Sequence, residues 1–130
     1  MPQNYSRVAF LLAALFWAGL IFYLSHQPSI DMPALFPGQD KLFHLIAFGI
    51  LGFFTMGILR ASHKEHQTGQ VWLVTIAVML YGILDEFHQH FVPGRTADVY
   101  DVLADAIGGL LGGWTLYYLA SVLVRQSPNN

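Results

Sequence analysis

Carboxylate, imidazole and amide side chains gather at a few points of this sequence, each beside a long apolar run. The candidate site residues are Gln27, Asp40, Lys41, His44, Asp85, Glu86, His88, Gln89, Arg95, Asp98, Asp101 and Asp105. Paired carboxylates near apolar surface can have separated pKa values, as general acid–base catalysis requires. Ammonium and guanidinium groups bind phosphate or carboxylate, and arginine does so with bidentate geometry. This set of residue types therefore predicts a binding or catalytic site.

The spacing of several of these residues indicates helical faces. Asp40 and His44 are four residues apart, and Asp98, Asp101 and Asp105 are separated by three and four residues. Residues at such spacing are neighbours on the surface of a helix. We therefore expect each group to present its side chains on one face, as a site between helices requires.

The elements that carry these residues are predicted to cross a membrane. The sequence is 55% hydrophobic and 11% charged, whereas a soluble domain carries about 25% charged residues. Spanning the hydrocarbon takes about 20 residues, and apolar runs predict helices at about 8–24, 41–59, 71–91 and 98–124. The third helix reaches this length only by continuing through Asp85 and Glu86. We expect an all-α membrane protein, with residues 1–130 forming a single domain, a four-transmembrane-helix bundle.

Composition argues against several other classes. The net charge of -2 and the lack of a basic stripe predict no nucleic-acid partner. The sequence has no cysteine, which excludes disulfides and thiol chemistry. A cleaved signal peptide over the first run lacks an A-x-A cleavage pattern. A soluble core would need three helices that are apolar all round within one small domain.

The basic residues predict how the bundle is oriented. With the N-terminus inside, Arg7, Arg60, Lys64 and Arg125 would be cytoplasmic, against Lys41 and Arg95 outside. Cytoplasmic loops carry the excess of basic residues, so we expect an N-in, C-in arrangement. Antiparallel packing brings the polar helix ends together. This orientation places the candidate site on the extracytoplasmic side.

A glycine stripe continues the face of Asp101 and Asp105 along the last helix. It consists of Gly108, Gly109, Gly112 and Gly113. Small residues four apart allow close helix contact in lipid, so this face is expected to pack inside the bundle. We expect Asp85 and Asp105 to face the interior. Arg95, after a Pro-Gly turn signature, is expected over the mouth of the site, paired with Glu86 or Asp101.

These residues resemble the VanZ-like family of small bacterial integral membrane proteins. The resemblance rests on Asp40-Lys41-Leu42-Phe43-His44, Asp85-Glu86-Phe87-His88-Gln89, Pro93-Gly94-Arg95 and Asp98-x-x-Asp101-x-x-x-Asp105-x-x-Gly108. Ser25-His26-Gln27-Pro28 also fits the pattern, and the resemblance extends over about residues 10–120. One departure is Asp105, where many members are expected to have asparagine. The resemblance implies the bacterial inner (cytoplasmic) membrane and a link to low-level teicoplanin resistance, but no settled activity.

Three functions are compatible with these residues. The first is binding of a lipid-linked cell-wall intermediate or a lipid headgroup, with Arg95 and Lys41 meeting phosphate or carboxylate. The second is an intramembrane hydrolase or transferase with Asp85, Glu86 and His44 as catalytic residues. That enzyme could use a divalent metal such as Mg²⁺ or Mn²⁺, held by Asp85, Glu86, Asp101 and Asp105, since both ions prefer oxygen ligands. The third is a transporter or proton-coupled channel, which with four helices per chain would require a homo-oligomer.

Overall fold

The computed structural model describes residues 3–28, 34–62 and 68–126, and four helices account for most of them. They are α1 (Gln3–Ser25), α2 (Gln39–Ser62), α3 (Gly69–Gln89) and α4 (Val99–Gln126). Each is long and apolar enough to cross a membrane, and the described residues contain no strand. The predicted all-α, four-helix membrane fold is confirmed.

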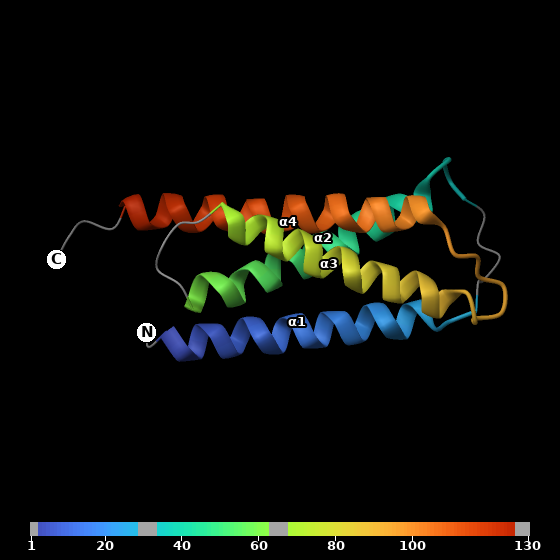
Figure 1. Cartoon of the computed structure of the whole chain (residues 1–130), viewed down its shortest axis with the longest axis horizontal. Helices are drawn as coiled ribbons and strands as arrows, with labels where there is room; N and C mark the ends of the chain where they lie inside the picture. Colours follow the sequence, from blue (N-terminus) through green and yellow to red (C-terminus); the bar gives the residue numbers. More distant parts are fainter. Residues whose placement is uncertain (1–2, 29–33, 63–67, 127–130) are drawn as a thin grey trace.

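The helices run side by side along the long axis of the molecule (Figure 1). The first turn of α1 and the last turn of α4 lie at one end. The end of α1, the start of α2, the end of α3 and the start of α4 lie at the opposite end, which we call the polar end. Short connections therefore bring together residues far apart in the sequence, as the antiparallel arrangement predicts.

Two helix boundaries at the polar end differ from the predicted ones for local reasons. Helix α3 ends at Gln89 instead of residue 91, because the next residues make tighter turn bonds, such as Phe91 N–H to His88 O at 3.0 Å. Helix α4 begins at Val99 instead of residue 98. Asp98 precedes its first turn, and Asp98 Oδ1 accepts the Tyr100 N–H at 2.9 Å, a capping bond for a helix N-terminus.

The turn between α3 and α4 follows the Pro-Gly signature. Arg95 N–H donates to Val92 O at 3.1 Å, so Pro93 and Gly94 are its two central residues. Gly94 has φ of 78°, which the second central position of a type II turn requires and which glycine adopts without strain. The turn directs the chain back over the polar end.

The glycine stripe lies where α4 packs against both α2 and α3. A Cβ built on Gly112 would collide with Gly49 O of α2, and one on Gly109 would lie 2.7 Å from Val78 Cγ1 of α3. A Cβ built on Gly113 would lie 3.3 Å from Val74 Cγ1. The stripe thus lets α4 approach α2 backbone to backbone, and it makes room for the valine side chains of α3. The predicted packing face is therefore confirmed.

The apolar core is narrow, and the outer surface is also apolar. Phe48, Met56, Val74 and Val78 are buried between the helices. Large apolar side chains are exposed along all four helices, including Phe16, Phe43, Trp72 and Leu123. A soluble monomer rarely exposes so much contiguous apolar surface, whereas hydrocarbon solvates it. The surface therefore agrees with a multi-pass membrane protein.

Candidate functional site

Side chains from α2, α3 and α4 meet at the polar end in two adjoining groups. The inner cluster consists of His44, Asp85, Glu86 and Asp105. The outer cluster consists of Asp40, Lys41, Asp98 and Asp101. The structure thus brings together most of the candidate residues that the helical spacing placed on shared faces.

His44 lies at the centre of the inner cluster and is held by a hydrogen bond with Asp105. His44 Nδ1 lies 2.9 Å from Asp105 Oδ1, and Asp105 is fully buried, at 0% exposure. A carboxylate can only accept hydrogen bonds, so it fixes the imidazole proton on Nδ1. His44 Nε2 then points the other way, 3.8 Å from Glu86 Oε1 and 3.9 Å from Asp101 Oδ2. Both distances exceed a hydrogen bond, so the Nε2 atom faces carboxylate oxygens without bonding to them.

Glu86 is buried with only one of its two oxygens bonded. Its side chain reaches the start of α4, where Glu86 Oε2 accepts the Asp98 N–H at 2.8 Å. The residue is 5% exposed, and Glu86 Oε1 has no hydrogen-bond partner in the described part of the chain. Buried polar atoms are seldom left unpaired. The unpaired oxygen is the one directed at His44 Nε2.

Asp85 joins the inner cluster to α1. Asp85 Oδ2 accepts hydrogen bonds from Ser25 Oγ at 2.9 Å and from Gln89 Nε2 at 3.0 Å. All three residues are buried. As predicted, Asp85 and Asp105 both face the interior of the bundle. Ser25 was part of the sequence pattern but was not predicted as a site residue, because one serine at a helix end carries no distinctive signal.

Gly82 is a second contributor that sequence reasoning missed. A Cβ built on Gly82 would collide with the Asp105 carboxylate. The glycine therefore leaves the space in α3 that the Asp105 side chain of α4 occupies. Gly82 lies outside the glycine stripe of α4, so only the packing of α3 against α4 identifies its role.

The outer cluster is organised around Lys41. Lys41 Nζ donates to Asp98 Oδ2 at 2.7 Å, Asp101 Oδ1 at 3.0 Å and Asp40 Oδ2 at 3.1 Å. The hydrogen bond from Lys41 lowers the pKa of Asp98, and the Tyr100 N–H lowers it further. Lys41 thus neutralises carboxylates of its own bundle instead of presenting its charge to an outside phosphate.

The predicted pairing of Arg95 with Glu86 or Asp101 is wrong. Arg95 Nε donates to Gln27 O and Arg95 Nη2 donates to Leu24 O, both at 3.1 Å. The last carbonyls of a helix have no partner within the helix, and a cation there also suits the helix dipole. Arg95 therefore holds the end of α1 and the residues just after it, and the ion pair with Asp101 expected of Arg95 is made by Lys41.

Two further candidates lie beside the inner cluster and are not directed into it. Gln27 follows the end of α1, and Gln27 Nε2 donates back to Tyr23 O of that helix at 3.0 Å, so Gln27 meets Arg95 through its carbonyl. His88 Nε2 lies 3.1 Å from His26 Nδ1, and the His88 ring stacks on Phe22 with centroids 4.6 Å apart. These contacts attach α1 to α3 at the polar end.

Two groups at the polar end have the geometry of metal ligands. Within each, one ligand atom per residue lies within 4.8 Å of the others: His44, Asp85 and Glu86 in the first, and Asp40, Asp98 and Asp101 in the second. Lys41 already occupies the second group. The set predicted from sequence, with Asp101 and Asp105 as ligands, is not a single group, because Asp105 is bound to His44.

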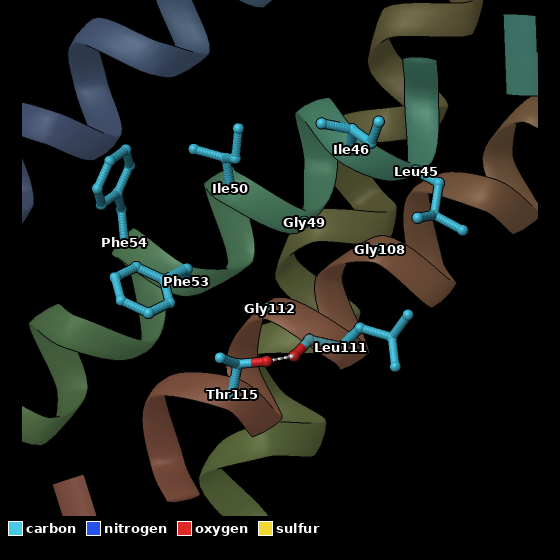
Figure 2. A pocket seen from close by; sticks show the side chains of 10 residues that line it. All are labelled: Leu45, Ile46, Gly49, Ile50, Phe53, Phe54, Gly108, Leu111, Gly112 and Thr115. Atoms are coloured by element: carbon cyan, nitrogen blue, oxygen red, sulfur yellow. Dashed lines mark hydrogen bonds between the residues drawn. The ribbon is translucent and has the colours of Figure 1, made fainter. Parts of the chain in front are cut away.

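An apolar groove runs along the crossing of α2 and α4 (Figure 2). It has a volume of about 420 Å³ and is lined by Leu45, Ile46, Gly49, Ile50, Phe53, Phe54, Gly108, Leu111, Gly112 and Thr115. The hydroxyl of Thr115 is satisfied by Leu111 O at 2.7 Å, so it adds no free polar group. The lining begins at Leu45, next to His44, and at Gly108, one turn after Asp105. The groove therefore begins close to the inner cluster.

The fold and the site define a four-helix membrane protein with buried carboxylates and a histidine at one end. The chain belongs to the VanZ/LLP1 family, whose model matches residues 10–121. A search of curated proteins and a search of solved structures each found no match to the chain. The predicted resemblance is thus confirmed.

Proposed function

We propose that this protein binds a lipid in the bacterial cytoplasmic membrane, with the headgroup at the polar end on the extracytoplasmic side. The lipid is a lipid-linked cell-wall intermediate or a lipid with a polar headgroup of similar chemistry. The observation that carries the proposal is the apolar groove between α2 and α4, which begins beside the inner cluster. A hydrocarbon chain in this groove would leave its headgroup next to His44 and Glu86.

The charges of the polar end restrict which part of a headgroup fits there. Lys41 and Arg95 are engaged within the bundle, whereas carboxylates dominate both clusters. Carboxylates accept hydrogen bonds from hydroxyl, amide and amine groups. Sugar hydroxyls and amide N–H groups of a cell-wall intermediate match these acceptors. A phosphate would need a cation in addition, since it would otherwise meet like charge.

A lipid-binding measurement with one groove variant tests the proposal. Leu111→Trp would fill the groove, and Leu80→Trp is the matched control, because Leu111 and Leu80 are 52% and 53% exposed and Leu80 is not in the lining. Native mass spectrometry in detergent would compare a polyprenyl-diphosphate-linked sugar with phosphatidylglycerol. We expect Leu111→Trp to weaken binding of the preferred lipid about tenfold, the equivalent of about 1.4 kcal/mol, and Leu80→Trp to leave it unchanged. Equal lipid binding by both variants would exclude the groove as the lipid-binding site.

The inner cluster also favours a second candidate function, an intramembrane hydrolase or transferase acting on the same lipid. Asp105 orients His44 so that Nε2 faces the site, the relation between an orienting carboxylate and a general base. His44 Nε2 would take the proton from an attacking water or hydroxyl, with Asp85 and Glu86 beside it. Turnover of a lipid-linked precursor by wild type, lost in His44→Gln with lipid binding retained, would establish catalysis. Binding without turnover would leave the binding function alone.

A role in teicoplanin susceptibility follows from the same proposal, as the family resemblance implies. A protein that binds a lipid-linked cell-wall intermediate would change how much of it meets a drug that targets such intermediates. Expression of wild type should raise the teicoplanin concentration that inhibits growth, and Leu111→Trp should not. An unchanged inhibitory concentration with wild type, at verified expression, would separate lipid binding from resistance.

A further inference from the structure

The inner cluster contains more buried carboxyl groups than the described residues around it can neutralise. Asp85 and Glu86 are each 5% exposed and Asp105 is 0% exposed. Ionisable groups inside a span are expensive unless they are paired or reach water. Of the basic side chains in the described ranges, His44 alone is directed at Glu86 and Asp105, while Lys41 and Arg95 are engaged elsewhere. The cluster is therefore suited to a positively charged ligand.

We infer that the inner cluster binds one divalent metal ion through His44 Nε2, Glu86 Oε1 and the carboxylate of Asp85. Three observations carry this beyond the acidic composition of the cluster. One ligand atom of each residue lies within 4.8 Å of the others. Glu86 Oε1 is buried without a partner in the described part of the chain and lies 3.8 Å from His44 Nε2. Among the described residues His44 Nε2 has no hydrogen-bond partner, since its contacts with Glu86 Oε1 and Asp101 Oδ2 are 3.8 and 3.9 Å long.

The distances fit a metal centre after small side-chain movements. Two ligands of a tetrahedral ion, each about 2.0–2.1 Å from the metal, are about 3.4 Å apart. His44 Nε2 and Glu86 Oε1 are 3.8 Å apart. A shift of a few tenths of an ångström would bring this pair to ligand spacing. Asp85 has a ligand atom within 4.8 Å of the other two, and its carboxylate would likewise have to close to about 3.4 Å from each of them.

The surrounding residues hold the ligands in the orientation that metal binding uses. A ligating histidine usually donates its other ring N–H to a carboxylate, which fixes the tautomer and raises the basicity of the ligating nitrogen. Asp105 makes this contact with His44 Nδ1 at 2.9 Å. Ser25 and Gln89 hold Asp85 Oδ2, and Asp98 N–H holds Glu86 Oε2. His44 and Glu86 are thus each fixed by an atom that is not needed for the metal, and two hydrogen bonds hold the Asp85 side chain beside them.

The donor set indicates the class of ion. Imidazole nitrogen together with carboxylate oxygen suits Mn²⁺ and Zn²⁺ better than Mg²⁺ or Ca²⁺, which prefer oxygen alone. Three protein ligands leave a position open for a water or a substrate oxygen, as in catalytic metal sites. With His44 Nε2 bound to the ion, that nitrogen cannot also accept a proton, so this metal site and the general-base role of His44 are alternatives. Such an ion would supply the positive charge that a lipid phosphate requires. This link to lipid rests on the proposed function, but metal binding can be measured without lipid.

The test is a titration of the detergent-solubilised protein with metal alone, after treatment with a chelator and desalting. Binding of Mn²⁺ is followed by loss of the free-ion electron paramagnetic resonance signal, and Zn²⁺ is added as a competitor. Pulsed resonance detects a nitrogen nucleus coordinated to Mn²⁺. We expect one ion per chain, a nitrogen coupling that His44→Gln abolishes, and no tight binding by Glu86→Gln. His90→Gln changes an exposed histidine outside both clusters, so it is the matched control for His44→Gln and should bind as wild type does. Asp40→Asn tests for binding in the outer cluster instead.

Asp105→Asn keeps the test decisive if a ligand variant does not fold. Its side-chain oxygen can still accept from His44 Nδ1, but the charge is lost, so we expect metal affinity to fall about 10–100-fold. Lack of stoichiometric Mn²⁺ or Zn²⁺ binding by wild type overturns the inference. So does binding that Glu86→Gln and Asp105→Asn leave intact, or that only Asp40→Asn removes. Metal binding in a protein that binds no lipid would uphold this site and reject the proposed function.

Discussion

Replacing Gly52 by alanine adds one methyl group where α2 lies against α4. A Cβ built on Gly52 would lie 2.6 Å from Gly109 O and 2.8 Å from Gly109 Cα, whereas ordinary contact begins at 3.4 Å. Both partners are backbone atoms, so no flexible side chain can move aside. The new Cβ and Gly109 O must move apart by about 0.8 Å to reach ordinary contact.

The expected change in the free energy of unfolding of Gly52→Ala follows from two opposing effects. Alanine favours a helix over glycine by up to about 1 kcal/mol. Forcing an extra methyl into a well-packed contact costs about 1–3 kcal/mol. Gly49→Ala is the matched control on the same helix face, because its Cβ would lie 3.5 Å from Gly108 O, an ordinary contact. Gly19→Ala on α1, with nothing within 4 Å, shows the helix preference alone.

Unfolding by titration with dodecyl sulfate in mixed micelles would give the free energy for each variant. We expect Gly19→Ala and Gly49→Ala to equal or exceed wild type in stability. Gly52→Ala should be about 1–3 kcal/mol less stable than Gly49→Ala, since the preference for alanine cancels in that comparison. Equal stability of these two variants, within about 0.5 kcal/mol, would show that the α2–α4 contact is slack and would refute the reasoning.

The remaining predictions concern orientation and the polar end. The chain has no cysteine, so single introduced cysteines report which side of the membrane each loop faces. An impermeant thiol reagent on intact cells should label Ala34→Cys and spare Thr68→Cys. The reverse pattern would place the site on the cytoplasmic side. Arg95→Lys should lose nearly as much stability as Arg95→Ala, about 1–3 kcal/mol, because an ammonium cannot reproduce the fork that reaches the carbonyls of Leu24 and Gln27 at the end of α1. A lysine variant that melts as wild type does would contradict this. The hydrogen bond from Lys41 lowers the pKa of Asp98 below its ordinary value of 3.8. The stability that ionised Asp98 contributes should therefore be complete above pH 3.8 and be lost as the pH falls through the lowered pKa of the folded protein. Asp98→Asn should therefore melt below wild type at neutral pH and converge with it in acid, whereas a difference that persists unchanged in acid would exclude the ion pair.

The periodicity of the sequence was sufficient to predict which residues lie together on one face of a helix. Asp40 and His44, four residues apart, do lie on the side of α2 that meets α4. The glycines after Asp105 do form its packing face. Pro93-Gly94 forms the expected turn. These features depend on local geometry, which the order of residues specifies.

The choice of partners at the polar end could not be read from the sequence. Arg95 binds carbonyl oxygens, and because every residue has a carbonyl, no pattern marks these two. Lys41 takes the carboxylates because its position at the start of α2 lets it reach α4. Gly82 matters only because Asp105 of another helix enters its space. Each of these depends on how far apart the helices lie, which periodicity does not determine.

The attachment of α1 at the polar end has a consequence for the motions of the protein. Beyond the buried Ile21, α1 is held by hydrogen bonds from Ser25 to Asp85 and from Arg95 to its last carbonyls, and by ring contacts to His88. Regions with few buried apolar contacts open locally at lower free energy than the rest of a fold. The last turn of α1 should therefore open without unfolding α2 and α4, and its amide hydrogens should exchange before those of the glycine stripe. Such an opening would break the hydrogen bond from Ser25 to Asp85 and expose the Asp85 side of the inner cluster at the side of the bundle.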